Sequence, residues 1–378
     1  LFKCGASLPQ SGWNRSGRSL DVQFLKIEGM SEEALPRIGI SIGDLNGVGM
    51  ELIIKTFGDA EMLELCTPVV FGSTKVVSYH RNAIDRRDFN FHIINQADDA
   101  LEGKANLVNC WKEEVKMDFG KADPEVGAYA VKSLEAACDA LEAGTIDALV
   151  TAPINKESIQ SKDFRFSGHT DYLESRFKSK ATMMFLAPEL RLALATVHVP
   201  LARVTELITP ELVEQKIMAL HQSLKDDFHL PKGRIAVLAL NPHAGDKGVI
   251  GKEDQEIVLP AIERAKEKGA LAMGPYPADS FFGSSAYQDF DMVLAMYHDQ
   301  GLVGFKSITF GEGVNYSAGL PIVRTSPDHG TAFDIAGEGK ADPGSFRSAV
   351  FAAIDLYRSR SGTAEMTANP LKIKGKKK

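Results

Sequence analysis

The sequence contains little that would indicate a secreted, membrane-bound or nucleic-acid-binding protein. Its 378 residues include only four cysteines, none of them in a Cys-x-x-Cys pair, so no disulfide framework is expected. No apolar run reaches the ~20 residues that a membrane-spanning helix needs. Basic residues, 43 against 50 acidic ones, give a net charge of −7 and no basic footprint for nucleic acid. We therefore expect a cytoplasmic protein without membrane or nucleic-acid partners.

The sequence does contain enough apolar residues for a large core. Hydrophobic residues make up 44% of the chain and charged residues 25%, which is usual for a globular protein. A chain of this length exceeds the usual size of one domain, so two domains are expected. Residues 1–29 lack both helical periodicity and a secretory apolar core. We expect them to be a disordered extension, with the functional chain beginning near Met30.

Short apolar runs alternate with helical patterns between residues 37 and 360. The runs predict strands and the patterns of period 3.6 predict helices. The expected strands lie at residues 38–42, 68–72, 148–150, 192–197, 235–240 and 292–297, and the clearest helices at 124–144, from 210 onward and at 255–268. This alternation predicts an α/β fold of mostly parallel strands covered by helices. Because no low-complexity linker is present, we expect the chain to cross directly between the domains.

Three of the nine histidines share a local context. His198, His243 and His298 each follow the carboxyl end of an expected strand, where open α/β sheets place their ligands. Three imidazoles that converge there would suit a divalent metal with positions left open for substrate. The alternative is that each is an ordinary loop residue. The histidines without this context, expected at the surface, are His80, His92, His221 and His229.

Two glycine-rich segments could hold an anion. The loop from Gly43 to Gly49 joins an expected strand to a helix, so its backbone N–H groups could bind a phosphate. It lacks the G-x-G-x-x-G pattern, however, and a tight turn would need the same glycines. In the second segment, residues 306–339, Lys306, Asn315 and Arg324 offer a point charge, an amide and a planar fork, which suit phosphate and carboxylate. These three side chains could instead face solvent.

The segment Ser167–Asp171 is a further candidate. His169 could donate a hydrogen bond to a phosphate, whereas Thr170 could instead cap a helix beginning at Tyr172. Asp279, in a Pro-Ala-Asp sequence, is a carboxylate that could lie beside the histidines. It is a candidate general base, with a metal-bound water as the alternative.

Taken in order, these stretches resemble the 4-hydroxythreonine-4-phosphate dehydrogenase family of pyridoxal-phosphate biosynthesis. The resemblance covers roughly residues 37–360. The matching segments are 41–44 with 47–49, 151–156, 167–170, 241–245, 274–279, 296–301, 313–315, 319–321, 324–326, 328–331 and 339–342. The sequence departs from the family at Asp44-Leu45-Asn46, where Pro is common, and this departure bears on substrate preference.

The resemblance implies roles for particular residues. Metal ligands fall on His198, His243 and His298, and substrate contacts on His169, Thr170, Lys306, Asn315 and Arg324. It also implies a homodimer in which the partner chain completes each metal site near the subunit interface. The implied fold has two α/β/α domains with a cleft between them, akin to isocitrate and isopropylmalate dehydrogenases. Residues 37–155 with 305–365 would form the first domain, and residues 156–304 the second, which carries the metal and dimer side.

The implied reaction is the oxidation and decarboxylation of 4-phosphohydroxy-L-threonine to 3-amino-2-oxopropyl phosphate. NAD, or NADP, would accept the hydride, and Zn, Mg, Co or Mn would act as the Lewis acid in both steps. Two alternatives stay open. A dehydrogenase for threonate or erythronate 4-phosphate would share every motif, whereas a phosphate acyltransferase on a related fold would need no trio of histidines.

Overall fold

The computed structural model describes residues 34–309 and 311–368, and the account below concerns residues 35 onward, which form one unit by their internal contacts. The expected extension at residues 1–29 lies outside the described residues. Across the part that is described, no helix is long and apolar enough to cross a membrane.

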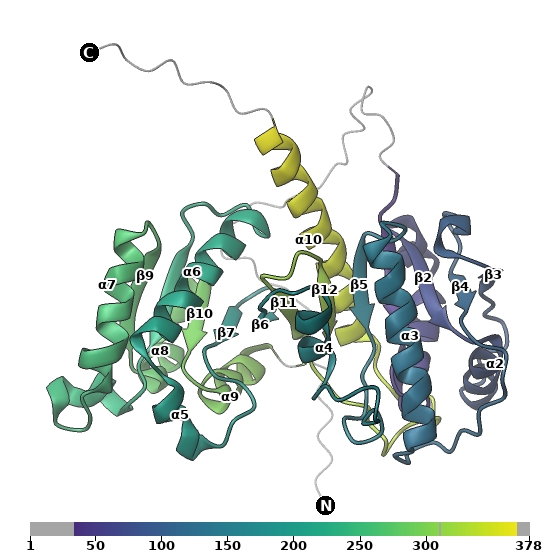
Figure 1. Cartoon of the computed structure of the whole chain (residues 1–378), viewed down its shortest axis with the longest axis horizontal. Coiled ribbons are helices and arrows are strands. Elements are labelled where there is room, and N and C mark those ends of the chain that lie inside the picture. The colour runs from purple at the N-terminus through teal and green to yellow at the C-terminus, as the bar shows by residue number, and fades with distance from the viewer. Residues whose placement is uncertain (1–33, 310, 369–378) are drawn as a thin grey trace, which may run out of the picture. The chain divides into compact units, whose positions relative to one another are not determined.

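Twelve strands of the described chain form one continuous sheet in the order β3-β4-β2-β1-β5-β12-β11-β6-β7-β10-β8-β9 (Figure 1). Their bounds are β1 Arg37–Ser41, β2 Thr67–Gly72, β3 His92–Ile94, β4 Asn106–Asn109, β5 Ala148–Thr151, β6 Thr182–Leu186, β7 Arg191–Leu194, β8 Arg234–Leu238, β9 Leu271–Tyr276, β10 Met292–Ala295, β11 Val314–Ala318 and β12 Arg324–Pro327. The antiparallel pairings are those of β6 with β7, β6 with β11 and β11 with β12. All other pairings are parallel, so the predicted α/β fold of mostly parallel strands is confirmed.

Side-chain caps mark the start of three of the described α-helices, at Ser73, Asp123 and Thr209. The α-helices are α1 Gly49–Phe57, α2 Thr74–Ala83, α3 Pro124–Glu142, α4 His169–Arg176, α5 Leu201–Leu207, α6 Pro210–Asp226, α7 Leu259–Glu267, α8 Ala278–Gly283, α9 His298–Thr309 and α10 Gly344–Ala368. The Asp123 carboxylate accepts a hydrogen bond from the Glu125 N–H at the start of α3. The Thr209 hydroxyl accepts one from the Leu212 N–H at the start of α6, 3.2 Å away. Both caps satisfy backbone donors that have no partner inside the helix.

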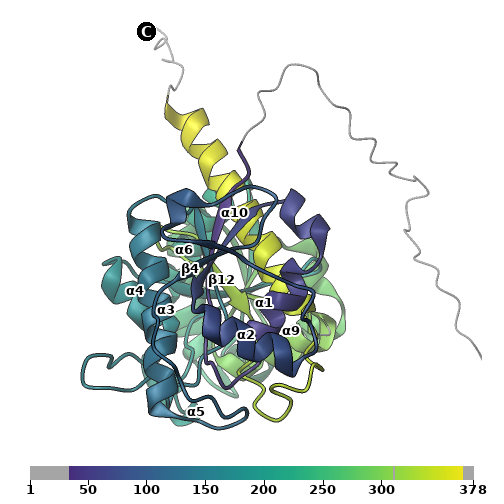
Figure 2. The same cartoon turned by 90° about the vertical axis from the view of Figure 1, so that its right-hand side faces the viewer.

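Helices cover both faces of the sheet around β1, β2 and β5. Val70 and Val150 belong to the buried cluster that includes side chains of α1 and α10, whereas Val69 and Leu149 belong to the cluster that includes those of α3. Successive strand residues point to opposite faces, so the two clusters lie on opposite sides of the sheet. The turned view shows α3 on one side of the strands and α1 and α10 on the other (Figure 2). Buried on both faces, these strands have the continuous apolar sequences typical of parallel sheets.

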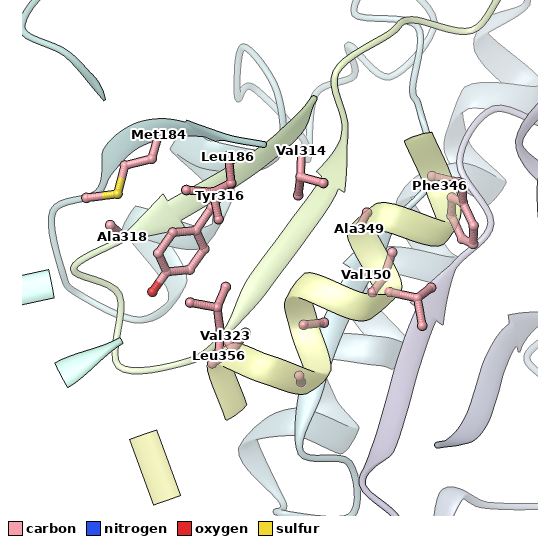
Figure 3. Close-up of a cluster of buried hydrophobic side chains, with 14 of the residues drawn as sticks. Val150, Met184, Leu186, Val314, Tyr316, Ala318, Val323, Phe346, Ala349 and Leu356 are labelled. Atoms are coloured by element: carbon pink, nitrogen blue, oxygen red, sulfur yellow. The ribbon is translucent and has the colours of Figure 1, made fainter. Parts of the chain in front are cut away.

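The middle of the sheet is fixed by a core that draws on strands far apart in sequence. Tyr316 on β11 is fully buried and belongs to the same cluster as Val150, Met184, Phe346 and Leu356 (Figure 3). Burial of each such side chain stabilises the fold by about 2 kcal/mol. Because β11 pairs with both β6 and β12, this core holds the two ends of the sheet together.

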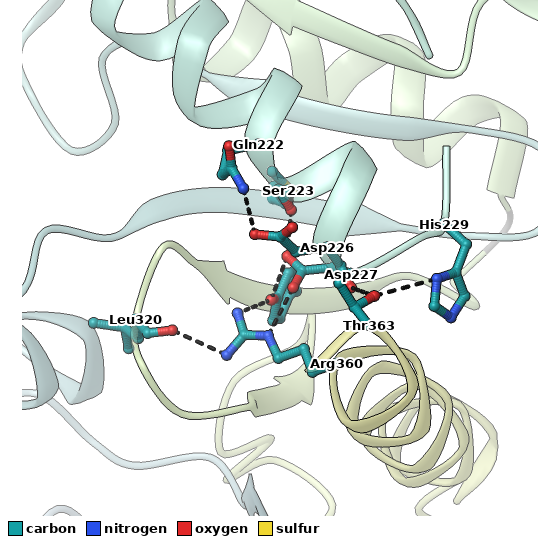
Figure 4. A network of polar contacts seen from close by, with 10 residues as sticks. Gln222, Ser223, Asp226, Asp227, His229, Leu320, Arg360 and Thr363 are labelled. Atoms are coloured by element: carbon teal, nitrogen blue, oxygen red, sulfur yellow. Dashed lines mark hydrogen bonds and ion pairs between the residues drawn. The ribbon is translucent and has the colours of Figure 1, made fainter. Parts of the chain in front are cut away.

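A buried polar network ties the carboxyl end of α6 to α10 and β11. The Asp227 carboxylate accepts hydrogen bonds from Nε of Arg360 at 2.7 Å, from the Tyr316 hydroxyl at 2.8 Å and from the Ser223 hydroxyl (Figure 4). The Arg360 guanidinium also donates to the carbonyl of Leu320 at 3.0 Å. The side chain of Asp227 is 3% exposed and that of Arg360 22%, so each charge depends on the other for its solvation.

Candidate functional site

A cavity of about 800 Å³ opens along the middle strands of the sheet. Its walls come from the segment after β5, from α4, from the chain following β7, from α9, and from β11 and β12. Seven of the nine residues predicted for the site line this cavity. They are His169, Thr170, His198, His298, Lys306, Asn315 and Arg324. The structure therefore brings together side chains that are up to 155 positions apart in the sequence, between His169 and Arg324.

Arg324, the first residue of β12, is a buried cation without an anionic partner. Its Nη2 and Nε donate to the Thr151 hydroxyl at 2.6 and 3.1 Å, and its Nη1 donates to the Ser317 hydroxyl at 3.3 Å. No carboxylate of residues 35–309 or 311–364 lies within ion-pair distance of it. Burial lowers the pKa of Arg324 to about 10. Because burying an unpaired charge is costly, this residue favours an anionic ligand in the cavity.

Two further side chains in the cavity have buried atoms with no hydrogen-bond partner in the described chain, namely Nε2 of His169 and Oδ1 of Asn315. The pKa of His169 lies well below its usual value, first because the ring is buried and then because Arg324 and Lys156 are positively charged nearby. His169 is therefore a neutral imidazole beside two cations, able to donate an N–H to an oxyanion. Buried polar atoms without a hydrogen-bond partner destabilise the fold, so these two atoms favour a ligand that forms the missing hydrogen bonds.

Two lysines add positive charge to the cavity wall. Lys306 on α9 is about half exposed and its Nζ lies 3.9 Å from Oδ2 of Asp328. Lys156 follows β5, and its charge lowers the pKa of both His169 and His198. The sequence analysis did not assign Lys156 to the site, although its position just after the carboxyl end of a strand was the same signal that singled out the histidines. With Arg324, three cationic side chains line the cavity.

His198 and His298 lie side by side, with ring centroids 5.9 Å apart. Nδ1 of His298 lies 2.7 Å from Oδ1 of Asp299, an arrangement that fixes the tautomer so that Nε2 carries the free lone pair. Burial, followed by the charge of Lys156, lowers the pKa of His198, so its ring is neutral. Two imidazoles that share one cavity have the donor chemistry that divalent transition metals prefer.

His243 does not line this cavity. It is exposed in the segment Pro242–Gly248 after β8, where residues His243 to Lys247 all have positive φ, between 42° and 74°. Residues other than glycine adopt this backbone conformation only when the surrounding structure imposes it. Here the buried Asp254 carboxylate accepts the N–H groups of Leu240 at 2.6 Å and Asn241 at 3.0 Å. Among the described residues, no group of three or more His, Cys, Asp or Glu side chains is arranged to hold a metal ion.

Asp279 is also placed away from the cavity. It is exposed in the first turn of α8 and does not contribute to the lining. A single chain therefore assembles two of the three predicted metal ligands and all five predicted substrate contacts, but not the candidate base.

Three details of the sequence analysis are corrected by the structure. Helix α4 begins at His169 with Gly168 as the capping residue, so Thr170 lies within the first turn and does not cap a helix starting at Tyr172. His80 was predicted at the surface but is fully buried, because α2 turns it inward against Phe119. The loop Gly43–Gly49 is buried and does not line the cavity.

The glycines of that loop serve a close packing contact. A Cβ on Gly43, whose φ is +70°, would lie 2.3 Å from the carbonyl oxygen of Pro153. The Asp44 N–H donates to that same carbonyl at 2.9 Å. Only glycine tolerates both the left-handed backbone and the close approach. The tight-turn alternative therefore accounts for Gly43, and the loop packs against Pro153, which lines the cavity.

Comparisons with known proteins agree with this description. The family model described as "Pyridoxal phosphate biosynthetic protein PdxA" matches residues 64–353. A 4-hydroxythreonine-4-phosphate dehydrogenase of Bacteroides thetaiotaomicron is 51% identical over 343 residues, which are 90% of this chain and 94% of that protein. A relative from Oceanobacillus iheyensis, provisionally named D-threonate 4-phosphate dehydrogenase, is 37% identical over 85% of this chain and 97% of its own length. The crystal structure of a 4-hydroxythreonine-4-phosphate dehydrogenase from Burkholderia phymatum is similar at a TM-score of 0.73 and 35% identity, covering 86% of this chain and 99% of that one.

Proposed function

Because this chain belongs to the family described as pyridoxal phosphate biosynthetic protein PdxA, we propose that it oxidises and decarboxylates 4-phosphohydroxy-L-threonine, with NAD as the hydride acceptor. The product would be 3-amino-2-oxopropyl phosphate, a precursor of the pyridoxine ring. Relatives named as 4-hydroxythreonine-4-phosphate dehydrogenases match most of its length.

One observation supports the proposal that the substrate is phosphorylated. The buried guanidinium of Arg324 has only hydroxyl partners in the described chain, and Nε2 of His169 is buried and unbonded in the same cavity. A phosphate or carboxylate would supply the missing negative charge and accept both N–H donors. Lys306 and Lys156 add positive charge at the cavity wall. Clustered positive charges in a cleft attract anions and so raise their local concentration.

Each side chain then has a definite task. Arg324, His169 and Thr170 hold one anionic group of the substrate, while Lys306 and Asn315 hold the other. Oδ1 of Asn315 is buried without a hydrogen-bond partner in the described chain, so the amide can be turned to present either its oxygen or its NH₂ group to the substrate. Two fixed anionic ends restrict rotation of the short chain between them, so the hydroxyl carbon is held at one place in the cavity. Asp299 keeps the ring of His298 in a single orientation through the 2.7 Å contact at Nδ1.

The paired histidines fit a divalent cation such as Zn, Co, Mn or Mg. We propose that His198 and His298 hold it through ring nitrogens and that His243 is the third ligand. When bound, the cation supplies Lewis-acid polarisation of a substrate oxygen, and NAD, or NADP, supplies the hydride acceptor. The neutral state of His198, which burial and the nearby charge of Lys156 maintain, keeps its lone pair available as a ligand.

The position of His243 supports a homodimer in which this residue comes from a second copy of the chain. A smaller hollow beside His198 and His298 is lined by Val197, Val199, Leu201, Val204 and Tyr297. Leu201 is 70% exposed there, and exposed apolar side chains around a hollow are typical of an interaction surface. In the segment that carries His243, Val249 is 82% exposed. In a two-fold interface, residue i of one copy contacts residue j of the other and residue j contacts residue i, so each copy would complete the site of the other.

We further propose that residues 37–155 with 305–365 form one domain and residues 156–304 the other. The cavity draws Thr151 and Arg324 from β5 and β12 of the first domain, and Lys156, His198 and His298 from the second. A cleft between two domains is a common place for a ligand site. The phosphate would then lie between Arg324 of the first domain and His169 of the second, with the metal toward the second.

The principal alternative is a dehydrogenase of threonate or erythronate 4-phosphate, which the relative from Oceanobacillus iheyensis favours through its name. A phosphate acyltransferase is a weaker alternative, because that chemistry does not require the metal-binding histidines proposed here.

The experiment is an assay of NADH formation with 4-phosphohydroxy-L-threonine, D-threonate 4-phosphate and unphosphorylated 4-hydroxy-L-threonine, each with NAD and added divalent metal. We expect the first compound to have the highest kcat/KM and the unphosphorylated compound to lose at least about a hundredfold, because two charge-assisted hydrogen bonds are lost. A protein that reduces NAD equally well with the unphosphorylated compound would refute the assignment of Arg324 and His169 to the phosphate.

A further inference from the structure

The polar residues assigned to the substrate and the metal account for only part of the cavity. A second group of lining residues is apolar and has no task in the proposed function. Five of its side chains are Met183 and Phe185 of β6, Val197 in the segment after β7, and Leu302 and Val303 of α9. Apart from the thioether of Met183, they carry no hydrogen-bonding group. We call these five residues the apolar wall.

Helix α9 presents one side of its surface to the cavity. His298, Leu302 and Lys306 follow one another at intervals of four residues and all line the cavity, so they form a single stripe along the helix. The opposite side packs into the core through Phe305, which is fully buried. At a rise of about 1.5 Å per residue, Leu302 lies about 6 Å along the helix from each of its two neighbours in the stripe. The apolar wall is therefore placed between His298 and Lys306.

Strand β6 contributes to the apolar wall through alternate residues. Met183 and Phe185 line the cavity, whereas Met184 between them belongs to the buried core on the other face of the sheet (Figure 3). Phe185 is paired with Asn315 of β11, and its ring centroid lies 5.8 Å from that of Phe305 of α9. This part of the wall thus adjoins a proposed substrate contact on one side and packs against α9 on the other.

The proposed substrate has no part that fits the apolar wall. Each of the four carbons of 4-phosphohydroxy-L-threonine carries a polar group, namely the carboxylate, the amine, the hydroxyl and the phosphate ester. The cavity of about 800 Å³ is in the size range of pockets that enclose much larger, drug-sized ligands. The second reactant, NAD, carries a flat nicotinamide ring that must lie beside the hydroxyl carbon to accept the hydride, and the face of such a ring packs well on apolar side chains.

We propose that the apolar wall binds the nicotinamide ring of the cofactor, through Met183, Leu302 and Val303. This inference rests on the proposed function. In the oxidation, the hydroxyl carbon gives a hydride to the ring, which converts NAD⁺ to NADH, while the hydroxyl proton is released to solvent and a ketone forms. Leu302 is one helical turn from His298, the histidine proposed to hold the metal at the hydroxyl oxygen, so the wall lies beside the reacting carbon. Apolar side chains there also keep water away from the path of the hydride.

The test compares the binding of NADH with that of ADP-ribose, which has the adenosine half and both phosphates but no nicotinamide ring. Met183→Gln nearly keeps the length of the side chain but puts an amide on the wall, which the face of the ring cannot satisfy. We expect the dissociation constant of NADH, measured from its fluorescence, to rise by about tenfold, and that of ADP-ribose, measured by calorimetry, to change by less than about threefold. Met183→Leu, which keeps the wall apolar, should bind NADH as wild type does.

Val303→Ser is a second variant at the same wall. Val303 is 67% exposed, so its replacement should leave the fold intact, and we expect NADH to bind at least about threefold more weakly while ADP-ribose binding is unchanged. Leu271→Ser is the matched control, because Leu271 is 44% exposed on β9 and does not line the cavity. It should change the binding of neither ligand. A rise in melting temperature with inorganic phosphate should persist in every variant, which shows that the Arg324 part of the cavity is intact.

Two results would overturn the inference. One is an unchanged affinity for NADH in both Met183→Gln and Val303→Ser, and the other is an equal loss of NADH and ADP-ribose binding in these variants. Failure of the proposed function would be seen separately, as a wild-type protein that binds NADH at this wall but oxidises no phosphorylated hydroxy acid.

Discussion

The guanidinium of Arg324 lies against the hydroxyl of Thr151, which accepts hydrogen bonds from Nη2 at 2.6 Å and from Nε at 3.1 Å. Thr151 ends β5 and Arg324 begins β12, the neighbouring strand of the sheet. The hydroxyl fixes the direction of the side chain but leaves its positive charge without an anion. The fold thus holds a cation in place before any ligand binds, which lowers the entropy lost on binding.

A contrast between Arg324, which is buried, and Arg360, which is partly buried, tests this interpretation. Replacing Arg324 with Met removes an unpaired buried cation, so we expect the free protein to be at least as stable as wild type. The same change should abolish the rise in melting temperature caused by inorganic phosphate and lower kcat/KM by about a hundredfold or more. Thermal denaturation with and without phosphate, together with the NADH assay, measures both effects.

Arg360→Met is the control for that contrast. Its guanidinium pairs with the Asp227 carboxylate at 2.7 Å, so its loss leaves an uncompensated buried charge and should cost about 3 kcal/mol of unfolding free energy. Phosphate should still stabilise this variant. If the two arginine variants were destabilised to the same extent, the view of Arg324 as a residue kept for ligand binding would be wrong.

The origin of the third histidine can be tested by complementation between inactive variants. If His243 comes from a second copy, co-expressed His243→Ala and His298→Ala chains form heterodimers with one intact site. Random pairing then predicts recovery of about a quarter of wild-type activity. Each variant alone should be folded and inactive. Size-exclusion chromatography with differently tagged chains measures heterodimer formation, and heterodimers that form without activity would argue for a site built within one chain.

Burial of His80 predicts a pH dependence of stability that is separate from the site. Burial lowers its pKa from 6.5 to about 4, and its Nε2 lies 2.8 Å from the carbonyl oxygen of Leu45. Between these two pKa values the unfolded chain binds a proton that the folded chain does not. Stability is therefore complete above about pH 6.5 and is lost as the pH falls toward about 4, by up to about 3 kcal/mol.

His80→Gln removes that titration and keeps a donor for the carbonyl of Leu45. Chemical denaturation at several pH values should show a smaller decline in unfolding free energy for the variant than for wild type. Parallel declines would mean that His80 is protonated in the folded protein. His92, which is exposed, offers a control substitution that should leave the pH dependence unchanged.

Much of the fold follows from local patterns. The apolar runs that precede His198, His243 and His298 are the strands β7, β8 and β10, which are parallel neighbours in the sheet. The carboxyl ends of parallel strands lie at one edge, so the convergence of His198 and His298 could be predicted from their positions alone. Likewise, the caps at Asp123 and Thr209 mark helix starts through side chains that local sequence specifies.

Other features depend on contacts between distant segments. The left-handed backbone from His243 to Lys247 involves four residues that are not glycine, and the carboxylate of Asp254 that supports it is supplied by the next segment of the chain. His80 is surrounded by polar neighbours in sequence but faces Phe119 in the fold. The pairing of β6 with β11 makes the sheet continuous. It could not be predicted, because the sequence of neither strand indicates which strand it pairs with. Lys156 was not predicted as a site residue, because its position beside His169 and His198 depends on the fold of the whole cavity.

The most direct test of the account measures NADH and CO₂ together during turnover of 4-phosphohydroxy-L-threonine by the purified protein, before and after removal of metal by a chelator. The account predicts equal amounts of the two products, loss of both after chelation, and recovery on addition of Zn, Co, Mn or Mg. Formation of neither product with saturating NAD and metal, or full activity after chelation, would contradict it.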